Sequence, residues 1–146
     1  MEIVKMTAAH VAQIAQLEKV CFSDPWSENS IASELENELS LWLVALDGDA
    51  VAGYVGSQSV LGETDMMNIA VSPDYRRQGI GERLVTELVS WLKARGSHSL
   101  MLEVRASNLP AQKLYEKLGF QTVGRRPRYY HNPKEDALIL RKEWQI

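Results

Sequence analysis

Two arginines, a glutamine and two glycines lie close together within Asn68–Glu82, a stretch that reads NIAVSPDYRRQGIGE. The pattern predicts an apolar strand that ends near Pro73 and leads through Arg76–Gly81 into a helix. Turns of this kind bind anions, because unpaired N–H groups and the positive end of the helix dipole point at one spot and glycine lets the backbone approach closely. The sequence therefore predicts a site for the pyrophosphate of a cofactor.

Neither common nucleotide motif fits this turn. A Walker loop requires GxxxxGK followed by Ser or Thr, and a dinucleotide fingerprint requires GxGxxG. Here Gly79-Ile80-Gly81 is followed by Glu82-Arg83-Leu84. Out of context, the same residues are also compatible with an ordinary helix entry that carries exposed arginines.

The secondary structure expected around the turn differs on its two sides. A β-hairpin at Asp47-Gly48-Asp49 precedes the turn, and helices alternate with strands after it. We expect strands in the opening EIVKM and over 39–47, 50–60, 64–72, 99–104, 120–125 and 137–142, and helices from Thr7, from Ser27 to about Glu38, over 82–95 and over 110–118. This order predicts an α+β fold with a central βαβ unit.

A right-handed crossover would make the strands over 65–71 and 99–104 parallel, and ligands of such sheets collect at the carboxyl ends of the strands. Along the second strand, Glu103 falls on the face opposite Leu102 and Val104. Both strands end beside the anion-binding turn, and Glu103 is a carboxylate within a strand that helices are expected to cover on at least one side. A structural ion pair with Arg105 or another arginine, or a place near solvent, is the alternative that spacing leaves open.

The helix that follows this strand has Asn108 as its predicted cap and Pro110 near its first position. Tyr115 lies on its apolar face with Ala111 and Leu118. An aromatic residue in such a place usually belongs to the core, so its chemistry is not decided by position alone.

Composition narrows the classes of function. The 146 residues are 45% hydrophobic, which suits one domain over 1–146, and the net charge of −3 does not favour general nucleic-acid binding. We expect no membrane span, no signal peptide and a cytoplasmic location. The single cysteine, Cys21, is predicted to be a small buried residue, and the three histidines are too scattered to predict a metal site.

Two motifs together resemble the GCN5-related N-acetyltransferases. Arg76–Gly81 resembles their R/Q-x-x-G-x-G/A signature, and Asn108, Ala111, Tyr115, Gly119 and Phe120 resemble their second block. The flanking CFSDPWS, LEVRASN and RYYHNPKEDALIL segments are most similar to the bacterial subgroup that acetylates the N-terminal alanine of ribosomal proteins. The resemblance implies a mixed sheet of about seven strands, helices on both faces, and a parallel pair of strands 4 and 5 that splays apart.

The resemblance also implies the roles of residues in acetyl transfer from acetyl-coenzyme A, with no metal. Glu103 would accept a proton and Tyr115 would donate one. The residues implied in binding acetyl-coenzyme A are Ile69, Ala70, Val71, Arg77, Gln78, Gly79, Ile80, Gly81, Glu82 and Asn108.

The N-terminal peptide of a ribosomal protein is the expected partner, bound by a monomer that touches neither nucleic acid nor membrane. Trp26 and Tyr130 are the predicted substrate-binding residues, although both could be ordinary packing. Two other hypotheses remain open: an acetylase of small amines or of other protein N-termini, and a non-catalytic acyl-coenzyme A binding module.

Overall fold

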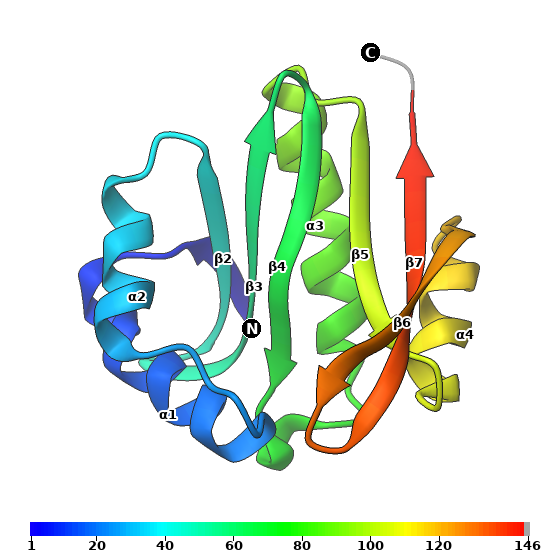
Figure 1. Cartoon of the computed structure of the whole chain (residues 1–146). Coiled ribbons are helices and arrows are strands. Elements are labelled where there is room, and N and C mark those ends of the chain that lie inside the picture. Colours follow the sequence, from blue (N-terminus) through cyan, green and yellow to red (C-terminus); the bar gives the residue numbers. More distant parts are fainter. Residues whose placement is uncertain (145–146) are drawn as a thin grey trace.

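The computed structural model describes residues 1–144 and contains a seven-stranded mixed sheet with the order β1-β2-β3-β4-β5-β7-β6 (Figure 1). Among the strands of this described part of the chain, only β4 and β5 pair in parallel. The strands are β1 (Glu2–Lys5), β2 (Ser40–Asp47), β3 (Ala50–Val60), β4 (Glu63–Val71), β5 (Ser99–Arg105), β6 (Gln121–His131) and β7 (Lys134–Glu143).

Helices cover both faces of the sheet. They are α1 (Val11–Cys21), α2 (Glu28–Ser33), α3 (Ile80–Ala94) and α4 (Leu109–Lys117), with short 3-10 turns η1 (Ala8–His10), η2 (Glu34–Glu36) and η3 (Pro73–Tyr75). The predicted N-caps of α2 and α4 are confirmed. Ser27 Oγ accepts the Ser30 N–H at 3.1 Å, and Asn108 Oδ1 accepts the Ala111 N–H at 3.2 Å. Within residues 1–144 no helix is both long and apolar enough to cross a membrane.

Alternation along the central strands explains the two layers. On β2, Leu41 and Leu43 pack with α3, whereas Trp42 and Val44 pack with α1 and α2. Both sets are almost completely buried. The sheet is therefore apolar on both faces in its middle, as Figure 1 shows by the helices in front of and behind it.

The parallel pair opens after three residues. Glu63–Asp65 of β4 are in register with Ser99–Met101 of β5, and no pairing follows within the described chain. Next to this point the register between β3 and β4 shifts, because Gly56 faces Asn68 while Ser57 faces Met66. Met67 is thus the extra residue of a β-bulge, which bends β4 away from β5. The expected splay is confirmed.

The last hairpin is longer than the sequence pattern predicts. β6 runs through Pro127 to His131, although we expected a strand over 120–125 and no strand between 126 and 136. An outer strand tolerates proline, and the register with β7 shifts between Arg126 and Tyr130. The helix expected from Ser27 to about Glu38 is shorter than predicted. α2 ends at Ser33, and only the turn η2 follows it.

Candidate active site

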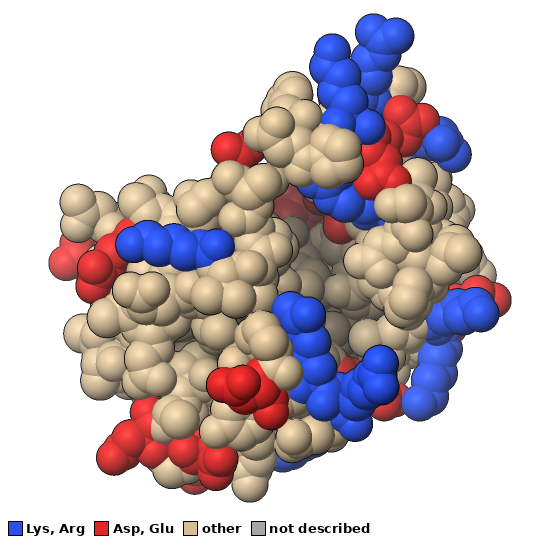
Figure 2. Space-filling view, turned by 90° about the horizontal axis from the view of Figure 1, so that it is seen from below, with Lys and Arg blue, Asp and Glu red and all other residues tan. Residues whose placement is uncertain are grey.

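A cleft of about 880 Å³ opens where β4 and β5 separate. Viewed along the strands from this end, the surface is hollowed, and Lys and Arg side chains stand on opposite sides of the hollow (Figure 2). Six residues predicted for the site line the cleft: Trp26, Ile69, Glu103, Asn108, Tyr115 and Tyr130. We call Cys21–Trp26 the N-terminal wall and Tyr129–Pro133 the C-terminal wall; β4 and β5 form the floor.

Glu103 projects from the floor into this cleft. Its neighbours Leu102 and Val104 face the core and are 2% and 5% exposed. Within residues 1–144 its carboxylate has no ion pair and no side-chain hydrogen bond, and Arg105 pairs with Glu135 instead, at 3.3 Å. Burial raises the pKa of Glu103, an effect that the charge of Arg126 opposes and that of Asp65 reinforces. The carboxylate is available to a ligand and is more basic than usual.

Tyr115 belongs both to the core and to the cleft. Only 5% of the residue is exposed, and its ring packs edge-on against Phe120 at 5.4 Å between centroids. It also lines the cleft, and no partner within residues 1–144 hydrogen-bonds its hydroxyl. Burial, with a smaller contribution from Tyr130, raises the pKa of Tyr115 to about 12. The phenol therefore keeps its proton at neutral pH.

The anion-binding turn precedes α3 and presents its backbone donors to solvent. Arg77 and Gly79 have φ of 65° and 74°, and a Cβ on Gly79 would meet no atom within 4 Å. Within the described residues, no acceptor takes the N–H groups of residues 77–82; the first helical bond runs from the Arg83 N–H to the Gly79 carbonyl at 3.0 Å. The turn can therefore bind an anion through its main chain.

Arg76 points back from this turn toward α1. Its guanidinium lies 3.7 Å from Cys21 Sγ and 3.4 Å from the Val71 carbonyl oxygen. Cys21 is half-buried and lines the cleft, so the prediction that it is simply a buried residue is wrong. Arg76 thus links the C-terminal end of α1 to the C-terminal end of β4.

The main chain of β4 also faces the gap. The Ser72 N–H donates to the Ala52 carbonyl of β3 at 2.8 Å. Because successive amides of a strand point to opposite edges, those of Ile69 and Val71 point away from β3, into the gap. The Ile69 N–H already donates to Asn68 Oδ1 at 3.1 Å. The backbone N–H and C=O of Ala70 point toward β3, like those of Ser72, and Ala70 is 7% exposed.

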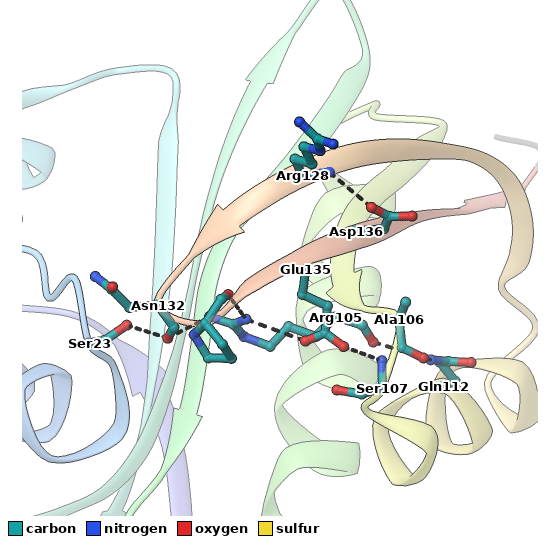
Figure 3. Close-up of polar contacts among 10 residues, drawn as sticks. Ser23, Arg105, Ala106, Ser107, Gln112, Arg128, Asn132, Glu135 and Asp136 are labelled. Carbon is teal, nitrogen blue, oxygen red and sulfur yellow. Dashed lines mark hydrogen bonds and ion pairs between the residues drawn. The ribbon is translucent and has the colours of Figure 1, made fainter.

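The C-terminal wall is held by polar contacts that Figure 3 displays. Glu135 pairs with Arg105 and accepts the Ser107 N–H at 2.7 Å, and Asp136 accepts the Arg128 N–H at 2.9 Å. These contacts lower the pKa of both carboxyl groups. The Arg105 guanidinium also stacks 4.2 Å from the centre of the Tyr130 ring. Tyr130 is therefore oriented toward the cleft by a charged neighbour.

The N-terminal wall is held from inside by Glu18, which is 0% exposed. Its Oε1 accepts the Trp26 N–H at 2.8 Å, and its Oε2 accepts Asn68 Nδ2–H at 2.6 Å and the Tyr54 hydroxyl proton. Burial raises the pKa of Glu18, while the bonds from Tyr54 and Trp26 oppose that rise. The Trp26 ring packs edge-on against Trp42 at 5.4 Å, so Trp26 serves both the core and the cleft.

Glu18 and Asn68 were not predicted from the sequence. A signal for Glu18 exists, because it follows Val11, Ile14 and Ala15 on the buried stripe of α1 at helical spacing. A charged residue in such a stripe needs buried partners. Asn68 has no comparable signal, since its role depends on the bulge at Met67 and on Glu18.

The sequence model of the Acetyltransferase (GNAT) family matches residues 11–120, and the chain belongs to this family. The [ribosomal protein bS18]-alanine N-acetyltransferase of Escherichia coli (strain K12) is 41% identical over 126 residues, which cover 85% of this chain and 84% of that protein. The protein of the same name from Haemophilus ducreyi (strain 35000HP / ATCC 700724) is 34% identical over 131 residues, 88% of this chain and 90% of its own.

Solved structures of acetyltransferases have a similar fold. The crystal structure of the ribosomal-protein-S18-alanine N-acetyltransferase from Escherichia coli is similar with a TM-score of 0.91 and 36% identity, covering 99% of this chain and 94% of that one. Arabidopsis thaliana NAA60 in complex with acetyl-CoA has a TM-score of 0.87 at 17% identity and covers 97% of both chains. At that identity the likeness concerns the fold.

Proposed function

We propose that this protein transfers the acetyl group of acetyl-coenzyme A to the α-amine of the N-terminal alanine of a small-subunit ribosomal protein. One observation carries the proposal: the Glu103 carboxylate and the Tyr115 phenol, from β5 and the helix after it, line one cleft. Neither has a polar side-chain partner within residues 1–144. The name of the 41% identical Escherichia coli relative supplies the substrate class.

The reaction needs a base, a site for the oxyanion and an acid. Glu103, directly or through a water, takes a proton from the ammonium group, and the amine nitrogen then forms a bond to the thioester carbonyl carbon. The Val71 N–H, which faces the gap, stabilises the developing oxyanion. As the carbon–sulfur bond breaks, Tyr115 gives its proton to the coenzyme A sulfur. The acylated nitrogen loses its second proton, which returns through water to the Tyr115 phenolate, and Glu103 releases its own proton to solvent. No acyl-enzyme forms.

The residues around the gap between β4 and β5 could bind the different parts of coenzyme A. The N–H groups of residues 77–82, together with exposed Arg77, would bind the pyrophosphate at the start of α3. The opened edge of β4 at Ile69–Val71 would contact the pantetheine arm, and Asn68 already satisfies one of its amides. Asn108, at the start of α4, lines the cleft beside Tyr115.

Energetics favour an α-amine over a lysine side chain. With ordinary pKa values of about 8 and 10.4, deprotonation at pH 7 costs about 1.4 and 4.6 kcal/mol respectively. A single half-buried carboxylate is an adequate base for the first amine. Trp26 and Tyr130, on opposite walls, would bind the first residues of the peptide and exclude water around the amine.

All these groups come from one chain, so the enzyme needs no second copy to complete its cleft. We propose that it works as a monomer, without nucleic acid, in the cytoplasm where ribosomal proteins are made.

Mass spectrometry of ribosomal proteins incubated with the enzyme and acetyl-coenzyme A tests the proposal. We expect one acetyl group on the N-terminal alanine of a small-subunit protein, and none when that α-amine is blocked beforehand. Glu103→Gln serves as the inactive control. Acetylation of internal lysines alone, or turnover of free polyamines and amino-sugars without peptide modification, would refute the proposed substrate.

A further inference from the structure

We propose that Glu18 is a positioning residue for this reaction: its buried carboxylate ties the N-terminal wall to the bulged segment of β4, and so fixes the position of this wall over the floor where amine and thioester meet. The inference rests on the proposed function. Glu18 itself does not line the cleft, so it acts through Trp26 and Asn68, which do.

Three donors from three different segments converge on this carboxylate. The Trp26 N–H comes from the wall, Asn68 Nδ2 from β4, and the Tyr54 hydroxyl from β3. A carboxylate is the side chain that fits, because it only accepts hydrogen bonds and has room for several donors. With 0% exposure, no water replaces a lost partner easily.

The consequences reach the reacting groups through Asn68. Since Asn68 Nδ2 is held by Glu18, its Oδ1 is turned to the Ile69 N–H at 3.1 Å. That bond fixes the main chain directly after the bulge residue Met67, at the edge of β4 that faces the gap. The same carboxylate holds the backbone of Trp26 on the opposite side. One buried group therefore positions both the N-terminal wall and the adjoining edge of the floor.

Glu18→Gln is an informative change because it conserves shape and turns the oxygen that accepts from Asn68 and Tyr54 into a donor. If the glutamine oxygen keeps the Trp26 N–H, its NH₂ group faces the NH₂ group of Asn68. Asn68 must then rotate, and the Ile69 N–H loses its acceptor. In the double variant Glu18→Gln/Asn68→Asp, the glutamine donates to the new carboxylate, whose second oxygen again accepts the Ile69 N–H.

Glu34 provides a matched control outside the cleft. It is 8% exposed, and it accepts hydrogen bonds from Trp42 Nε1 at 3.3 Å and Gln58 Nε2 at 2.8 Å. Glu34→Gln therefore alters a buried carboxylate that bonds to the same Trp42 but, within residues 1–144, has no hydrogen bond to a residue that lines the cleft.

The experiment compares the natural protein, Glu18→Gln, the double variant and Glu34→Gln. For an N-terminal alanine peptide we expect Glu18→Gln to lower kcat/KM by about 10²-fold at most, the scale of a 1 Å misplacement, with unchanged acetyl-coenzyme A affinity. The double variant should recover most of that loss. Glu34→Gln should lower the unfolding midpoint and leave kcat/KM near the natural value.

Hydrogen exchange gives a readout that does not depend on activity. Glu18→Gln should accelerate amide exchange in both 22–27 and 66–71, and the double variant should restore protection. Kinetics and exchange in Glu18→Gln that match those of Glu34→Gln would overturn the positioning role, as would a double variant with no recovery. If the natural protein itself fails to acetylate the peptide, the proposed function fails, and the exchange result still decides whether Glu18 ties the two segments.

Discussion

The two walls of the cleft are stabilised by different physics. The N-terminal wall rests on a buried layer, where Trp26, Trp42 and Tyr54 pack together and Glu18 accepts three hydrogen bonds. The C-terminal wall projects from an outer hairpin and depends on ion pairs such as Arg105–Glu135 and Arg125–Asp136, whose members are partly exposed. Buried contacts resist salt, whereas exposed ion pairs are screened by it.

This difference suggests a division of labour. The wall held by the core gives the amine a fixed surface, while the wall held by surface charges can adjust to the peptide. Between them the walls touch through the Ser23 hydroxyl, which donates to the Asn132 carbonyl at 3.2 Å (Figure 3).

Glu103→Gln should have the largest effect because it removes the base from the floor that both walls enclose. We expect kcat to fall about 10²- to 10⁴-fold with little change in acetyl-coenzyme A affinity, measured by steady-state kinetics and titration calorimetry. An equal loss of turnover and affinity would mean that Glu103 supports the floor structurally.

The pH profile sharpens this prediction. Burial raises the pKa of Glu103 by favouring its protonated form, so kcat/KM should rise with pH through a pKa above the usual glutamate value. Tyr115, with a pKa of about 12, should add no alkaline loss near neutrality. The acid limb should disappear in Glu103→Gln.

A glycine substitution placed in each region tests the buried-versus-exposed contrast. In Gly56→Ala the new Cβ would lie 2.3 Å from Trp42 Cε2, and that ring cannot move between its aromatic neighbours, so unfolding should become easier by about 1–3 kcal/mol. Gly124→Ala on β6 brings Cβ to 3.3 Å from the flexible end of Ile139 and should change stability by about 0.5 kcal/mol or less. Chemical denaturation of both variants measures the difference; equal losses would refute the contrast.

Glu135→Gln should weaken the C-terminal wall in a salt-dependent way. Because hydrogen bonds and Arg105 lower the pKa of Glu135, its contribution is present above the ordinary glutamate pKa and is lost as pH falls through the lowered value. We expect the peptide KM to rise no more than about fivefold, and the difference from the natural protein to vanish in 1 M NaCl. A defect that persists in high salt would show that packing, rather than charge, holds this wall.

Ser23→Ala should have the smallest effect, since it removes one exposed hydrogen bond between the walls. We expect peptide release to accelerate about threefold, with kcat/KM for acetyl-coenzyme A unchanged. Stopped-flow measurement of peptide dissociation tests this, and Ser107→Ala is a suitable control because Ser107 contacts Glu135 through its backbone N–H. A large effect of Ser23→Ala would contradict the view that each wall is held independently.

Much of the floor could be predicted from the sequence. The crossover between β4 and β5 follows from the strand–helix–strand order, and alternation placed Leu102 and Val104 in the core and Glu103 opposite them, as the structure has them. Tyr115 was placed correctly on the apolar face of its helix. These features depend on local periodicity, which the sequence carries directly.

The walls could be predicted only in part. Tyr130 lies on a long outer strand rather than in a loop, because Pro127 is accommodated by a register shift and not by the end of the strand. The bulge at Met67 and the convergence of Glu18, Tyr54 and Asn68 depend on pairings between residues up to 50 positions apart. No periodic pattern encodes such contacts. A glutamate on the buried stripe of a helix indicates only that it has a buried partner.

The outer position of β6 has a consequence for the behaviour of the protein in concentrated solution. An unpaired strand edge is a template for aggregation. Here Pro127 offers no N–H to an incoming strand, Arg128 adopts a φ of 55° that breaks the extended backbone, and the charge of Arg126 repels a second copy of the same edge. The segment that borders the cleft therefore also hinders neighbouring molecules from pairing with this sheet edge to edge.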